Sequence, residues 1–161
     1  MIRLIQPKDA DHVAAVIRGA FATLADVLDP PPSALRVQGG TIVEHLALGG
    51  SGALHDDDGC ILWIERDSAL YLSRLAVLPA SRGRGVAGAL LAFAEAIGRE
   101  AGWETIRLEV RLALDGNRRL FRRAGFVEGE RHSHPGYAHP TYVAAEKRLR
   151  RIHHSCDNHG E

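Results

Sequence analysis

Residues 72–95 read LSRLAVLPASRGRGVAGALLAFAE and carry the densest chemical signal in the chain. An apolar strand ends at Val77, and the proline turn at Pro79 is followed by a glycine-rich loop. Beyond the loop, apolar residues share one face of a helix, at Val86, Leu90, Phe93, Ala94 and Ile97. The stretch therefore predicts a strand, a turn and a long helix that Gly102 ends.

The loop between this strand and helix has the composition of an anion site. Gly83, Gly85 and Gly88 let a ligand approach the main chain closely, and the first amides of a helix have no partner within it. A helix start of this kind binds phosphate oxygens. Arg82 and Arg84 add positive charge beside those amides.

Two common phosphate loops fit this stretch poorly. The order and the lysine of the G-x-x-x-x-G-K-[ST] loop are missing. Residues 83–88 satisfy the dinucleotide spacing G-x-G-x-x-G only formally, because the strands before them are joined by hairpins and not by helices. A nucleotide-binding regulatory domain is therefore disfavoured.

Strands and helices are predicted on both sides of this stretch. Before it, strands are expected at 2–5, 49–56, 60–66 and 69–77, a helix at 13–24 capped by Asp9 or Asp11, and two short helices within 33–48. Turns at Asp58-Gly59 and Asp67-Ser68 join the last three of these strands. After it, we expect a strand at 106–110, a helix at 115–124 and strands at 126–131 and 141–149. This order predicts an α+β fold, an α/β/α sandwich in which a mixed sheet carries helices on both faces.

Length and composition predict one folded domain. The chain has 161 residues, of which 45% are hydrophobic and 25% charged, as in ordinary globular proteins. We assign residues 1–149 to this domain and residues 150–161 to a polar, flexible tail. The tail contains His153, His154, Cys156 and His159, but they lack a second ligand cluster, so no metal is assigned.

Charge and cysteine content exclude several partners. Twenty Lys and Arg residues balance twenty Asp and Glu residues, so no global field attracts nucleic acid or an anionic membrane. Cys60 and Cys156 form no disulfide framework, and no apolar run is long enough to cross a bilayer. We expect a cytoplasmic protein.

The sequence resembles the GCN5-related N-acetyltransferase (GNAT) superfamily. Its signature is a strand of the type L-A-V-x-P followed by [RQ]-x-x-G-x-[GA] at a helix start, which here stands as Leu75 to Pro79 and Arg82 to Ala87. The likeness covers residues 2–149. It implies a mostly antiparallel sheet of six or seven strands flanked by about four helices and splayed between the fourth and fifth strands.

The resemblance also implies a donor, acetyl-CoA, and residues that hold it. Main-chain groups of Leu75, Ala76 and Val77 would pair with the pantetheine arm, and the Val77 N–H would stabilise the oxyanion of a tetrahedral intermediate. The expected donor-binding residues after this strand are Arg82, Gly83, Arg84, Gly85, Val86, Ala87, Gly88 and Asn117. A β-bulge that splays the two strands would open the edge for this pairing.

Catalysis requires a neutral amine, because a free aliphatic amine with a pKa of ~10.4 is mostly ammonium near neutral pH. Glu109 lies where some family members have a glutamate base, and it alternates with Leu108 and Val110. An ion pair with Arg107 or Arg111 is the competing interpretation of Glu109. His134, in a loop that would border the acceptor groove, is a second candidate base, and His132 lies in the same loop.

The sequence departs from the family at the position of the usual acid. Phe121 replaces the tyrosine that often protonates the leaving thiolate, and Tyr137 or Tyr142 would have to supply another phenol. We therefore predict an acetyl-CoA-dependent N-acetyltransferase acting on a small amine or a peptide N-terminus by direct attack, without an acetylated Cys60. The alternative is a noncatalytic acyl-CoA sensor of the same fold. A homodimer is compatible with the family, although no residue locates an interface.

Overall fold

Seven strands form one mixed sheet, in the order β1-β2-β3-β4-β5-β7-β6, in a computed structural model that describes residues 1–149. Neighbouring strands are antiparallel except β4 and β5, which are parallel. The strands are β1 (Ile2–Leu4), β2 (Ser51–His55), β3 (Gly59–Arg66), β4 (Ala69–Val77), β5 (Thr105–Arg111), β6 (Val127–His132) and β7 (Tyr142–Arg148). The predicted mixed sheet is confirmed.

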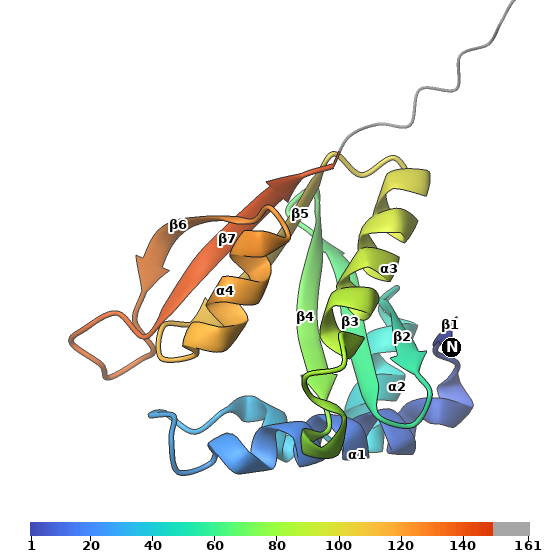
Figure 1. The fold of residues 1–161 in the computed structure, drawn as a ribbon, viewed down its shortest axis with the longest axis horizontal. Helices are drawn as coiled ribbons and strands as arrows, with labels where there is room; N and C mark the ends of the chain where they lie inside the picture. The colour runs from blue at the N-terminus through green and yellow to red at the C-terminus, as the bar shows by residue number, and fades with distance from the viewer. Residues whose placement is uncertain (150–161) are drawn as a thin grey trace, which may run out of the picture.

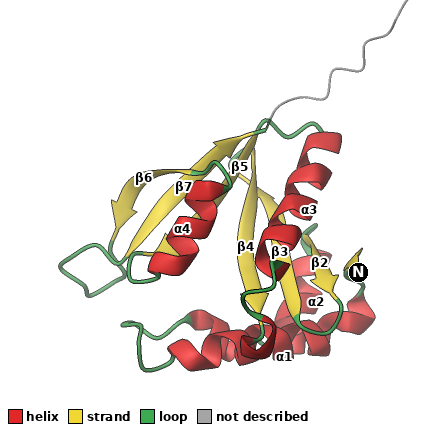
Figure 2. Cartoon of the chain, viewed as in Figure 1, coloured by secondary structure: helices red, strands yellow, loops and turns green. Residues whose placement is uncertain are grey.

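Helices cover both faces of the sheet, as the sequence predicts (Figures 1 and 2). Within residues 1–149 the α-helices are α1 (Ala10–Phe21), α2 (Gly39–Ala47), α3 (Val86–Glu100) and α4 (Asp115–Arg123). Short 3-10 turns lie at Pro7–Asp9, Ala22–Leu24, Ser33–Arg36 and Pro79–Ser81. The segment predicted as two short helices is thus a 3-10 turn followed by α2, and Gly39 begins α2.

Two hydrophobic clusters, one on each face, hold these layers together. On the α3 and α4 face, Leu90 and Phe121 pack with apolar residues of β4, β5 and β7. On the opposite face, Val13 and Ile17 of α1 and Ile42 of α2 pack with β2, β3 and β4. Alternating side chains of the central strands therefore serve both cores.

The sheet splits between its two parallel strands. β4 and β5 pair over only three positions, Leu70–Leu72 with Ile106–Leu108. The register of β3 against β4 then shifts, because Leu62 pairs with Arg74 but Trp63 pairs with Leu72. Ser73 is therefore an extra residue, a β-bulge that bends the strand. β4 and β5 diverge beyond it, and the open V is visible in Figure 1.

The segment after α1 lies across the open end of this V (Figure 1). Arg111, at the end of β5, donates from its Nη2 to the carbonyl oxygen of Pro30 at 2.6 Å. The Tyr137 hydroxyl, in the loop between β6 and β7, donates to the carboxylate of Asp29. The two walls of the V are thus linked at Asp29 and Pro30, and we call these two contacts the strap.

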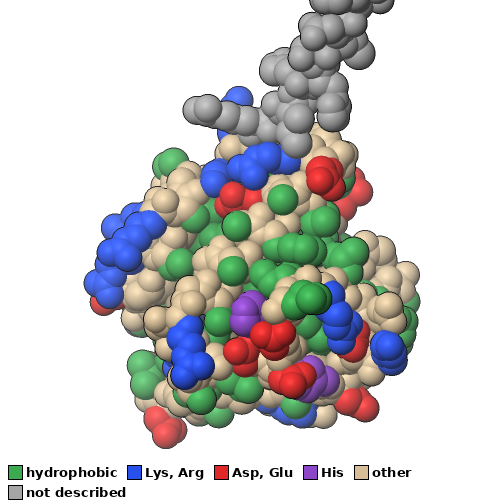
Figure 3. Space-filling model, turned by 45° about the vertical axis from the view of Figure 1, so that its right-hand side comes forward, with side chains coloured by type: hydrophobic (Ala, Val, Ile, Leu, Met, Phe, Trp, Pro, Cys, Tyr) green, Lys and Arg blue, Asp and Glu red, His purple; other side chains and the backbone are tan. Residues whose placement is uncertain are grey.

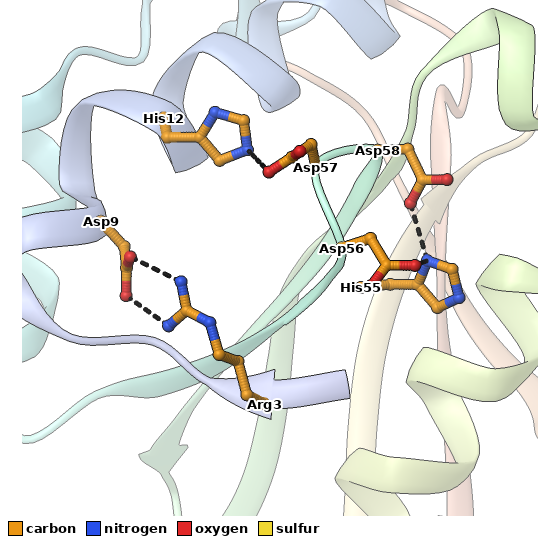
Figure 4. Close-up of polar contacts among 7 residues, drawn as sticks. All are labelled: Arg3, Asp9, His12, His55, Asp56, Asp57 and Asp58. Atoms are coloured by element: carbon orange, nitrogen blue, oxygen red, sulfur yellow. Dashed lines mark hydrogen bonds and ion pairs between the residues drawn. The ribbon is translucent and has the colours of Figure 1, made fainter. Parts of the chain in front are cut away.

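Two local predictions need correction. Asp9 occupies the predicted N-cap position of α1, but its side chain makes no cap hydrogen bond there. It accepts instead from the Gln6 amide at 2.7 Å and pairs with Arg3 (Figure 4). The β2–β3 turn is predicted at Asp58-Gly59, with Gly59 supplying a positive φ, but the positive φ of 43° belongs to Asp56. Glycine is needed at 59 because a Cβ there would meet Val86 Cγ1 at 2.9 Å, where α3 packs closely on β3.

The surface carries no field of one sign on the face drawn in Figure 3, where Lys and Arg are interspersed with Asp and Glu. None of the helices in residues 1–149 is long and apolar enough to cross a membrane. The predicted tail, with its histidines and Cys156, lies outside the described residues.

Candidate active site

The glycine-rich loop leaves open space at the start of α3. Gly83 and Gly85 both have φ of +77°, a left-handed conformation that favours glycine. A Cβ built on Gly83, Gly85 or Gly88 would meet nothing within 4 Å. The main chain of this loop is therefore accessible to a ligand.

The first turn of α3 presents amides toward that space. The first amide bonded within the helix belongs to Ala89, which donates to the carbonyl of Gly85 at 3.0 Å. The amides of Val86, Ala87 and Gly88 thus have no partner inside the helix. Together with the helix dipole they form a site with the chemistry to hold a phosphate.

The two arginines of the loop differ in their surroundings. Arg82 donates from Nη2 to the carbonyl of Ala20 at 2.7 Å and from Nε to the carbonyl of Val77 at 3.3 Å. Its guanidinium therefore ties the end of β4 to α1. Arg84 is exposed at the loop, where its charge adds to that of the helix start.

The divergence of β4 and β5 leaves a strand edge open. The Leu78 amide donates to the carbonyl of Asp58, toward the β3 side, at 2.8 Å. Because main-chain groups alternate along a strand, Ala76 also faces β3, whereas Leu75 and Val77 direct their N–H and C=O groups into the gap. Asn117 lies on the other wall, exposed in the first turn of α4.

A cavity of about 390 Å³ opens on the other face of the sheet, beneath α1 and α2. Its polar lining includes Tyr71, Ser73, Arg74 and Glu109 from the two diverging strands. A second cavity of about 330 Å³ lies along the same face toward β6 and β7 and shares Tyr71 and Glu109 with the first. Glu109 therefore lies beside the gap and lines both cavities.

Tyr71 lines both cavities together with Glu109. Burial raises the pKa of Tyr71 to about 12, and the charge of Glu109 adds to the shift. The phenol is therefore protonated near pH 7 and lies close enough to the carboxylate to feel its charge. Glu109 is exposed, and among residues 1–149 it forms none of the ion pairs predicted with Arg107 or Arg111: Arg107 pairs with Glu146 at 2.8 Å.

His134 lies in the same neighbourhood. Partial burial lowers its pKa, the nearby charge of Arg111 lowers it further, and Glu109 opposes both effects. The His134 amide donates to Thr141 Oγ1 at 3.0 Å, and its Nδ1 contacts the same oxygen. The structure thus brings both predicted bases to one face of the sheet. His132 instead stacks on Tyr142, with ring centroids 5.2 Å apart.

Other predicted participants lie in different surroundings. Phe121 is buried and packs edge-on against Phe126, with ring centroids 5.8 Å apart. Cys60 is fully buried in the cluster under α1, and burial raises the pKa of its thiol to about 12. Within residues 1–149, no group of three or more His, Cys, Asp or Glu residues is arranged to hold a metal ion.

Tyr71 and Arg74 line the cavity, although the sequence pattern did not indicate them as site residues. Simple alternation along β4 places these two side chains on opposite faces. The bulge at Ser73 adds one residue and brings both to the same face. The polar pair Ser73-Arg74, which interrupts an apolar run, was the signal that marked the position of the bulge.

With this geometry in place, the comparisons with known proteins decide the family. Residues 24–126 match the model of the acetyltransferase (GNAT) family. The chain belongs to this family. Members of the GNAT family transfer acyl groups, so the chain belongs among the acyltransferases, as its signature predicts. No sequence among the curated proteins matches the chain.

Solved structures share the GNAT fold at low sequence identity. One is a PaiA N-acetyltransferase from Thermoplasma acidophilum in complex with coenzyme A, with a TM-score of 0.71, 19% identity and coverage of 92% of this chain and 99% of that one. Another is the ribosomal-protein-S18-alanine N-acetyltransferase of Escherichia coli, with a TM-score of 0.68, 16% identity and coverage of 96% and 98%. At these identities the likeness establishes the fold.

Proposed function

We propose that this GNAT protein transfers the acetyl group of acetyl-CoA to a primary amine by direct attack. One observation carries the proposal: the gap between β4 and β5 has a phosphate-type helix start on one face of the sheet and a cavity containing Glu109 on the other. A donor threaded through the gap and an acceptor in the cavity would meet at the split. The coenzyme A complex of the Thermoplasma relative supports this choice of donor.

The donor would lie against main-chain groups. Its pyrophosphate fits the open space at Gly83, Gly85 and Gly88, and Arg84 adds charge there. Its pantetheine amides would pair with the free edge at Leu75 and Val77, as an added strand does. The Val77 N–H would then donate to the thioester oxygen as negative charge develops on it.

Glu109 is the proposed base. An acceptor ammonium in the cavity would lose a proton to this carboxylate before its nitrogen attacks the thioester carbon. The nitrogen–carbon bond forms, the carbon–sulfur bond breaks, and coenzyme A leaves as a thiolate. The nitrogen then loses its second proton to solvent, which gives the neutral amide. General-base assistance of this kind contributes roughly 10²–10⁴-fold in rate. His134 is the alternative base on the same face.

The leaving group receives little help from side chains. Phe121 has no proton to give, and Tyr71, with its pKa raised to about 12, is a weak acid. A simple thiol has a pKa of ~8.5, so the thiolate can depart unprotonated near neutral pH. The buried, protonated thiol of Cys60 favours direct transfer over an acetylated cysteine.

A noncatalytic acyl-CoA sensor is the second candidate, and Phe121 is the observation that favours it. Titration calorimetry with acetyl-CoA, followed by thiol release over a panel of amines, separates the two. Binding with turnover is the expected result. Binding without turnover on every amine favours the sensor, and failure to bind acetyl-CoA contradicts both.

A further inference from the structure

Arg74 is a positively charged side chain in the cavity that has no carboxylate partner among residues 1–149. Its Nη2 donates to the hydroxyl of Ser33 at 2.9 Å. Burial lowers its pKa, and the Tyr71 side chain opposes that shift. A partly buried cation without a counter-charge is costly, and an anion bound beside it would relieve that cost.

Two other arginines each pair with a carboxylate. Arg107 pairs with Glu146 at 2.8 Å, and Arg118 on α4 pairs with Glu128 at 2.9 Å. Arg74 differs from them in lining the cavity beneath α1 and α2. Its guanidinium can therefore offer N–H donors to a molecule that enters there.

Opposite charges thus line the same cavity. Arg74 comes from β4 and Glu109 from β5, and the Tyr71 phenol is influenced by both. A zwitterion matches this arrangement, with its ammonium toward Glu109 and its carboxylate toward Arg74. The guanidinium fork suits a carboxylate particularly well, because both oxygens can accept at once.

The remaining walls of the cavity restrict the size and polarity of the rest of the ligand, apart from its ammonium and carboxylate. Ile17, Val37, Ile42 and Leu62 give the cavity an apolar lining. The strap ties the segment that contributes Ser33 and Val37 to the cavity wall to β5 and to the β6–β7 loop. The cavity volume of about 390 Å³ lies in the range of small-molecule sites.

We infer that the acceptor is a free amino acid, or a similar small amine with a carboxylate and an apolar side chain, and that Arg74 determines this specificity. The inference rests on the proposed function and names its substrate class. Arg74 binds the carboxylate and does not take part in the proton transfer assigned to Glu109.

The test compares matched acceptors that differ in the carboxylate. The pairs are L-valine with isobutylamine, L-leucine with isoamylamine, and L-phenylalanine with phenethylamine. For each, kcat and KM are measured with acetyl-CoA, and affinity is measured by calorimetry in the presence of saturating coenzyme A. Since a hydrogen bond to a charged group is worth about 10- to 100-fold in affinity, the amino acid of at least one pair is expected to bind better by that factor.

Arg74→Met, which keeps the aliphatic stem, isolates the role of the guanidinium. It should remove the preference by raising the KM of the amino acid more than that of the matching amine, and Arg74→Lys should partly restore the preference. Arg107→Met, an arginine outside this cavity, is the control and should keep the preference.

Two results overturn the inference. One is a wild-type protein that binds carboxylate-free amines at least as well as amino acids in every pair. The other is an Arg74→Met variant that keeps the wild-type preference. Acetyl-CoA binding and thiol release with the simple amines, measured in the same preparations, report separately on the proposed function.

Discussion

The two faces of the β4–β5 gap are built from different parts of the polypeptide. On the α3 face, the proposed donor site consists of main-chain amides from one continuous stretch, residues 75–88. On the α1 and α2 face, the cavity is lined by side chains of α1, α2, β3, β4 and β5, including Ile17, His45 and Glu109. The first construction leaves a continuous signature in sequence, and the second does not. The proposed donor site can therefore be recognised from sequence, whereas the cavity requires the structure.

The largest effect should come from closing the donor site. Gly85→Glu places a carboxylate at the positive-φ start of α3, where it would repel the pyrophosphate. We expect acetyl-CoA affinity to fall by more than about 100-fold, since several charge-assisted bonds are lost together. Calorimetry measures the change.

Gly102→Glu is the matched control. Gly102 follows the other end of α3, has φ of +85° and also meets nothing within 4 Å, so the backbone strain is comparable. Its acetyl-CoA affinity should remain that of the wild type. Equal affinities for the two variants would contradict the donor site at Gly85.

Loss of the carboxylate on the opposite face should affect rate without affecting donor binding. Glu109→Gln is expected to lower kcat by about 10²-fold or more, since the acceptor then lacks its base. Thiol release gives kcat, and calorimetry gives the acetyl-CoA affinity, which should not change. Glu146→Gln, on the same face but paired with Arg107, is the control. Wild-type turnover of Glu109→Gln across the pH range would leave His134 as the candidate base.

Weakening the strap should affect the acceptor alone, and by a smaller factor. Tyr137→Phe removes the hydroxyl that donates to Asp29. The loss of one such bond should raise the acceptor KM about three- to tenfold, with the acetyl-CoA affinity unchanged. Tyr142→Phe, where the ring stacks on His132, is the control and should behave as the wild type. A KM change for acetyl-CoA in place of the acceptor would contradict the assignment of faces.

The smallest effect on activity is expected from the Arg3–Asp9 ion pair just before α1. The Arg3 guanidinium, donating two bonds to Asp9, holds the pKa of that carboxyl at about 2 (Figure 4). Because this pKa lies below the ordinary value of ~3.9, the pair stabilises the fold above that pH, and the contribution is lost as pH falls toward 2. Asp9→Asn should lower the free energy of unfolding by about 1–2 kcal/mol at pH 7, with unchanged kcat.

Denaturant unfolding at two pH values checks this expectation. The difference between wild type and Asp9→Asn should shrink at pH 2 to 3, where the wild-type carboxyl takes up a proton. Asp57→Asn is the control, since that side chain is 99% exposed and lies 3.8 Å from His12 (Figure 4). A difference that is the same at both pH values would contradict the role of the charge.

How far the sequence predicts this molecule depends on the range of the interactions involved. Element order, the glycine at the start of α3 and the positive-φ cap at Gly102 follow from local patterns, and the structure bears them out. The need for glycine at 59 was assigned to its turn, whereas it arises from contact with α3, which is distant in sequence. Local patterns predict local conformation better than they predict packing.

In the candidate site, too, features set by local pattern could be predicted and features set by long-range contacts could not. Glu109 could be named because the resemblance marks its strand, and its exposure on the side opposite Leu108 follows from alternation. Arg74 and Tyr71 could not be brought together, because one inserted residue reverses the facing of every later side chain in β4. The strap pairs Asp29 with Tyr137, a contact across 108 positions that no local pattern contains.

Because β4 pairs with β5 over only three residues, amide hydrogen exchange can report on ligand binding at the open edge of β4. Amide protons that face an open edge exchange with solvent, whereas those in a ladder are protected. Leu75 and Val77 should therefore exchange rapidly in the free protein, while Ala76, bonded to β3, exchanges slowly. A molecule that pairs with this edge would slow amide exchange at Leu75 and Val77 alone. The exchange rates of these two residues therefore measure binding at the edge, whether or not turnover occurs.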